Sequence, residues 1–90
     1  MSIGQDISKE INSARKQFPG NEDMMVALVE EVGELAQALI DHKRGKQSSS
    51  DVYAEAIQVA AMAIRIAQEG DSGFPYMYNT RCSLDFNKSK

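Results

Sequence analysis

The sequence predicts an all-α fold, and three observations support this prediction. Apolar residues recur at helical spacing in three segments, glycine or proline separates these segments, and no strand pattern is convincing, residues 74–78 being the nearest. The chain has 90 residues, of which 42% are hydrophobic and 26% charged, a balance typical of one small globular domain. We therefore expect a helical domain over residues 1–70 and an extended tail over residues 71–90.

The first helix is expected from residue 2 to about residue 18. Ser2 and Gln5 have the spacing of a capping box, in which each side chain bonds the other residue's backbone N–H. The apolar residues recur on one face: Ile3, Ile7, Ile11 and Ala14. Pro19 and Gly20 end this pattern, because both residues favour turns over helix.

The second helix is expected to follow Asn21, its predicted N-cap, and to run to about Arg44, with Gly45 just beyond its end. Glu31 lies on the shoulder of its apolar face, where a carboxylate is costly unless it is paired or bound to a cation. Gly33 costs about 1 kcal/mol relative to alanine, which suggests that a ligand or a neighbouring backbone needs the space. The residues of the apolar face are Met25, Leu28, Val29, Val32, Leu35, Ala36 and Leu39.

The third helix is expected over residues 51–69, after a polar loop whose serines can cap it, and Gly70 ends it. Apolar residues cover most of its circumference, and only a narrow polar stripe remains. Such a helix must be buried on several sides, which two other helices of a small chain can hardly do. We therefore predict a homodimer or homotetramer whose assembly completes the core. The polar stripe contains Asp51, Glu55, Gln58, Arg65 and Glu69, and Arg65 is expected to pair with Glu69.

Charge and composition exclude several classes of function. The net charge of −3 argues against binding to a nucleic-acid polymer, which requires a basic surface. The single cysteine, Cys82, excludes a disulfide framework and a thiolate zinc cluster, and it fits a reducing cytoplasm. No apolar run reaches the length of a membrane span, and no signal peptide is recognised, so no membrane association is expected.

Two groups of acidic and amide side chains are the candidate functional residues. Glu31 and Glu34 share one side of the second helix, and Glu55 and Gln58 share one side of the third. If these sides face each other, their oxygen atoms can hold hard divalent cations and, through them, the phosphates of a nucleotide. A solvated helix face remains the alternative for each glutamate, and Asp51 is expected to act only on the helix dipole.

These residues resemble the signature of the MazG-like all-α nucleoside triphosphate pyrophosphohydrolases, E-x-x-E on one helix and E-x-x-D on the next. Residues 31–34 match the first half and residues 55–58 the second, within a resemblance that covers about residues 7–71. The resemblance implies an antiparallel helical bundle that binds Mg²⁺ and hydrolyses a nucleoside triphosphate to the monophosphate and pyrophosphate. It also implies that Glu31, Glu34 and Glu55 are catalytic metal ligands, with Gln58 at the fourth ligand position.

Gln58 departs from the family pattern, which has aspartate at this position. An amide oxygen can coordinate a hard cation, but it contributes no negative charge. Three outcomes stay open: an active site with fewer or looser metals, compensation by Asp51 or Glu30, and a relative that binds a nucleotide or a metal without turnover. A purely structural helical oligomer is the remaining alternative.

Overall fold

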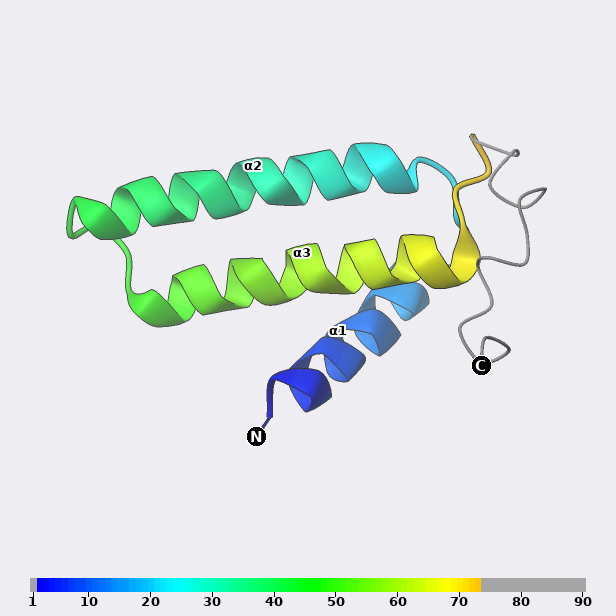
Figure 1. The fold of residues 1–90 in the computed structure, drawn as a ribbon, viewed down its shortest axis with the longest axis horizontal. Coiled ribbons are helices and arrows are strands. Elements are labelled where there is room, and N and C mark those ends of the chain that lie inside the picture. The colour runs from blue at the N-terminus through cyan, green and yellow to red at the C-terminus, as the bar shows by residue number, and fades with distance from the viewer. Residues whose placement is uncertain (1, 74–90) are drawn as a thin grey trace, which may run out of the picture.

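The computed structural model describes residues 2–73, which form three helices and no strand. These are α1 (Ile3–Gln17), α2 (Met24–Lys43) and α3 (Ser49–Glu69). α2 and α3 lie side by side and run antiparallel, whereas α1 crosses α3 obliquely (Figure 1). The all-α prediction is confirmed. Residues 74–90, which include the strand candidate at 74–78, Cys82 and most of the expected tail, lie outside the described residues.

Local side-chain caps fix the beginning of α1 and of α3. Ser2 and Gln5 form the predicted capping box, with both bonds at 3.0 Å. Ser48 and Asp51 form a second one, so α3 begins two residues earlier than predicted and the Asp51 carboxylate is bonded within its own helix end. Gly45 and Gly70 follow α2 and α3 with φ values of 77° and 72°, the left-handed region that glycine adopts at little cost.

α2 begins differently from the prediction. Asn21 is not its N-cap; the helix starts at Met24, after Asp23 in a left-handed conformation without a side-chain cap. A residue that follows α3 supplies the missing cap, because Asp71 accepts a hydrogen bond from the Met25 backbone N–H at 2.7 Å. Asn21 instead donates to the backbone carbonyl of Glu69. Two contacts between residues that are distant in sequence therefore join the start of α2 to the end of α3.

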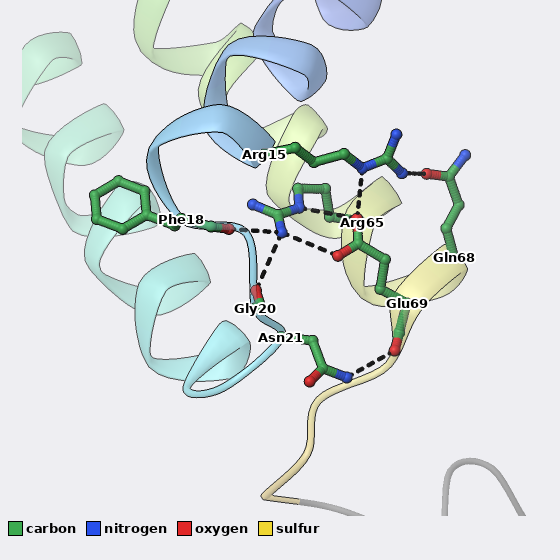
Figure 2. Close-up of polar contacts among 7 residues, drawn as sticks. All are labelled: Arg15, Phe18, Gly20, Asn21, Arg65, Gln68 and Glu69. Atoms are coloured by element: carbon green, nitrogen blue, oxygen red, sulfur yellow. Dashed lines mark hydrogen bonds and ion pairs between the residues drawn. The ribbon is translucent and has the colours of Figure 1, made fainter.

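A buried arginine joins α3 to the loop between α1 and α2 at the same end of the molecule (Figure 2). Arg65 is only 1% exposed, and its guanidinium donates to the carbonyls of Phe18 and Gly20 at 3.1 and 3.2 Å and to the Glu69 carboxylate at 2.9 and 3.0 Å. Arg15 on α1 adds a bond to Glu69 at 2.8 Å. The predicted pairing of Arg65 with Glu69 is confirmed, and Arg65 is buried within the described part of the chain.

The side of α2 that faces α3 is not the predicted apolar face. Met24 and Ala38 are buried, and Ala27, Leu28, Glu31 and Leu35 are half-buried, so the side with Glu31 packs on α3. Most of the predicted apolar face is exposed, with exposed fractions of 45% to 61% at Met25, Val29, Val32 and Leu39. Ile11, Ile57 and Ala61 complete a small core. None of the described helices is long and apolar enough to cross a membrane.

The buried position of Arg65 leads to a stability prediction. Replacing Arg65 with methionine removes the buried guanidinium from two loop carbonyls and from the Glu69 carboxylate, which keeps its bond to Arg15, so Arg65→Met should lower the free energy of unfolding by about 3–5 kcal/mol. Arg15→Met is the matched control, because Arg15 bonds the same carboxylate but is 41% exposed; it should cost less than about 1 kcal/mol. Urea denaturation measures both values, and equal losses would contradict a special role for the buried charge.

Candidate metal centre

α2 and α3 bring three glutamates together where the two helices pack side by side. Glu31 and Glu34 lie one turn apart on α2, and Glu55 projects from α3. Each offers a carboxylate oxygen, and the three oxygens lie within 4.8 Å of one another. Small residues on the same side of α2, Ala27 and Ala38, allow the helices to approach closely here. The structure thus joins the two halves of the acidic pattern seen in the sequence.

The convergence of these carboxylates is electrostatically unfavourable in the protein alone. One oxygen of Glu31 and one of Glu55, Oε1 in both, are buried and have no hydrogen-bond partner within the described part of the chain. Burial, reinforced by the charges of Glu34, Glu55 and Glu10, raises the pKa of Glu31 from 4.5 to about 7. Burial and then Glu34 also raise the pKa of Glu55. A proton or a cation is therefore strongly favoured at this point.

Gln58 lies one turn beyond Glu55 on α3 and lines a pocket of about 530 Å³ together with Glu31. The apolar part of the pocket wall comes from all three helices and the α1–α2 loop. Its volume is in the range of small-molecule sites. The pocket therefore places space for an organic ligand beside Glu31, one of the three converging glutamates. Its apolar wall consists of Ala14, Phe18, Met24, Val26, Ala27, Ala61 and Met62.

Glu10 on α1 is a residue of this region that the sequence reasoning missed. It lines the same pocket as Glu31 and Gln58, and its charge contributes to the raised pKa of Glu31. A signal was present in the sequence, because Glu10 lies between Ile7 and Ile11 on the apolar side of the first helix. A carboxylate in that position must face a neighbouring element or interrupt the packing.

The two residues proposed to compensate for Gln58 are placed elsewhere. The Asp51 carboxylate accepts bonds from the backbone and the hydroxyl of Ser48, at 3.1 and 3.0 Å. Glu30 is exposed and lies outside the group of converging oxygens, although it lines the edge of the same pocket. Asp51 therefore acts as an end-cap residue of α3, as the alternative interpretation of the sequence expected.

The donor set indicates the kind of cation that fits. All three converging ligands are carboxylate oxygens, and Gln58 lies in the wall of the pocket that Glu31 also lines. Oxygen donors without histidine or cysteine suit hard divalent cations such as Mg²⁺ and not Zn²⁺. A bound cation would coordinate the buried oxygens of Glu31 and Glu55 that have no hydrogen-bond partner. The residues present therefore fit a hard-cation site.

Comparison with protein-family models finds no match to the chain, and comparisons with curated proteins and with solved structures find none either. The function of the site is therefore inferred from its own residues.

The raised pKa of Glu31 predicts an unusual effect of its substitution. In the metal-free protein, a folded pKa above the unfolded value favours folding below about pH 4.5, and this contribution is lost as the pH rises through about 7. At about pH 8, Glu31→Gln removes the buried charge and should raise the free energy of unfolding by about 1–3 kcal/mol, after allowance for solvent screening.

Urea denaturation in a chelator at several pH values checks this prediction. The gain should shrink toward zero as the pH falls below about 4.5. The matched control is Glu30→Gln, which removes an equal charge from the neighbouring, exposed position. A destabilised Glu31→Gln variant at high pH, or an equal gain in both variants, would contradict the account of repulsion at the cluster.

Proposed function

We propose that this chain is a Mg²⁺-dependent nucleoside triphosphate pyrophosphohydrolase with a MazG-like helical bundle whose core is completed by assembly into a homo-oligomer. The observation that carries the proposal is the convergence of three carboxylates, two of them with a buried oxygen lacking a partner, next to a pocket large enough for a nucleoside. A reducing cytoplasmic location is part of the same proposal, because it fits the lone cysteine.

Residues of α2 and α3 and the residues of the pocket would have different roles in the proposed reaction. Glu31, Glu34 and Glu55 would hold the cation, with Gln58 as an additional oxygen ligand. When bound, the cation neutralises charge on the phosphates and lowers the pKa of a bound water. Attack of a water oxygen on the α-phosphorus would break the bond from that phosphorus to the bridging oxygen, and pyrophosphate would leave. One of the three glutamates, or a water bonded to it, accepts the proton.

The pocket would receive the nucleoside part of the substrate. Apolar residues from α1, α2 and α3 offer surface to a base or sugar, and Gln17 and Gln58 offer amide groups that can form hydrogen bonds. The pocket is also rich in carboxylates, including Glu10 and Glu31, which would repel a free triphosphate. Substrate binding should therefore depend on the cation, because the cation supplies the positive charge that the pocket lacks.

Pyrophosphate release is the direct test of this function. The purified chain is incubated with Mg²⁺ and a panel of canonical and modified nucleoside triphosphates. We expect release of monophosphate and pyrophosphate, and a loss of at least about 100-fold in Glu31→Gln because a metal ligand is removed. The control Asp41→Asn removes one charge from α2 at a position outside the pocket wall and should retain most of the activity. Binding of a nucleotide with Mg²⁺ but without release would instead support the binding-only alternative, which the amide at Gln58 favours.

Gln58 also predicts a gain of metal affinity on substitution. Gln58→Asp adds a carboxylate one turn from Glu55 and should lower the Mg²⁺ concentration needed for half-maximal thermal stabilisation by about tenfold. The control Gln68→Asp makes the same change on the exposed side of α3, near its end. Its Mg²⁺ dependence should equal that of the unmodified chain. If this Mg²⁺ concentration changes equally in both variants, or changes in neither, the cation does not bind near Gln58.

A further inference from the structure

The pocket beside Glu31 has an apolar wall with large side chains that face solvent in the described chain. Phe18 and Val26 line the pocket and are 68% and 57% exposed. Met24 and Met62 add two thioethers to the same wall, and thioethers make favourable contacts with aromatic rings. A concave apolar surface of about 530 Å³ on a small domain marks a binding site.

Hydrogen bonds after α3 bring the chain to the rim of this pocket. The buried Asp71 carboxylate accepts from the backbone N–H groups of Met25 and Gly73, at 2.7 and 2.8 Å. The Ser72 backbone N–H donates to the Asn21 carbonyl at 3.1 Å. The segment that follows Gly73 therefore begins beside the pocket. The sequence neighbours of Asn21 and Met25 all line it: Gly20, Glu22, Met24 and Val26.

The composition of residues 74–78 matches the apolar wall. Three of the six aromatic residues of the chain lie in these five positions, together with a methionine and a proline, in the order Phe74, Pro75, Tyr76, Met77 and Tyr78. The proline ring fixes one backbone dihedral, which lowers the entropy lost when the segment is ordered. Five residues span at most about 17 Å, whereas α3 covers about 12 Å between Met62 and Gly70. The segment is therefore long enough to cross the pocket.

The charges of the two parts of the chain are complementary. Residues 2–73 carry seven basic and twelve acidic side chains, whereas residues 74–90 carry three basic and one acidic. Among the described residues that line the pocket, the single basic side chain is Arg65, which is bonded to Glu69. Opposite charges favour contact between the later segment and the pocket rim. Five acidic residues line the pocket: Glu10, Glu22, Asp23, Glu30 and Glu31.

We propose that residues 74–78 dock in this pocket of their own chain, running from the α1–α2 loop toward Met62. The inference does not rest on the proposed function, because its evidence is the apolar wall, the bonds of residues 71–73 and the distribution of charge. Docking would regulate the proposed function, since the segment and a nucleoside would compete for the same wall. The affinity for a nucleotide is then lowered by the fraction of chains in which the segment is docked.

Disulfide trapping tests the docking without any measurement of activity. In a Cys82→Ser background, which contains no other cysteine, Met62→Cys is combined with Tyr78→Cys and oxidised mildly. We expect an intrachain disulfide, seen as faster migration on a non-reducing gel. The control combines Tyr78→Cys with Ala63→Cys, because Ala63 lies at nearly the same height on α3 but is exposed and outside the pocket wall. The control should react at least about tenfold more slowly.

Equal rates in the two double variants would overturn the proposal. The Met62→Cys and Tyr78→Cys chains are also oxidised as a mixture of single variants. Formation of a covalent dimer in this mixture, at the rate of the intrachain reaction or faster, would show that the pocket receives the segment of a second copy and would contradict docking within one chain.

Binding of Nile red, a neutral dye that fluoresces on apolar surfaces, gives an independent test. Removing the aromatic rings in Phe74→Ser/Tyr76→Ser should uncover the pocket and raise the dye fluorescence at least about twofold. Leu84→Ser/Phe86→Ser removes two apolar residues later in the same segment and should leave the fluorescence unchanged. Circular dichroism should show equal helical content in both variants. No increase in the first variant, or an equal increase in both, would contradict the proposal.

Discussion

The buried guanidinium of Arg65 is the interaction on which the arrangement of the three helices depends. A charge that is 1% exposed is costly unless its N–H groups are bonded, and here the partners are two carbonyls of the α1–α2 loop and the Glu69 carboxylate. These partners come from different parts of the chain, so they are satisfied together only when α1, the loop and the end of α3 adopt this arrangement. Asp71 adds the corresponding constraint at the first turn of α2.

The side of α2 that faces α3 is not its most apolar side. A rotation of α2 by about 120° would turn the exposed residues Met25, Val29 and Val32 toward α3 and Glu31 toward solvent, which would bury more apolar surface and relieve the carboxylate repulsion. The chain instead exposes these residues and concentrates negative charge between the helices. Both features are unfavourable for an isolated chain. Under the proposed function, a cation bound to the glutamates and assembly over the exposed apolar residues would offset them.

The sequence predicted the features that depend on residues close together along the chain. It did not predict the contacts between residues that are far apart along the chain. The capping box at Ser2, the glycines after α2 and α3, and the all-helical class follow from spacings of a few residues. The cap of α2 could not be predicted, because Asp71 lies 46 residues further along the chain than Met25. The bonds from Arg65 to the α1–α2 loop could not be predicted for a similar reason, since their acceptors are backbone carbonyls, which carry no side-chain signal. Helical spacing did indicate Glu31 as a carboxylate at a helix contact.

The charge balance of the cluster bears on how the proposed site would bind its substrate. Three converging carboxylates carry three negative charges at full ionisation, and Gln58 adds none. One divalent cation leaves this group with a net negative charge, which repels a triphosphate, whereas two leave a net positive charge, which attracts it. A fourth carboxylate in place of Gln58 would neutralise two such cations without substrate. Under the proposed function, the amide therefore makes full occupancy by the cation depend on the phosphates, and it couples metal binding to substrate binding.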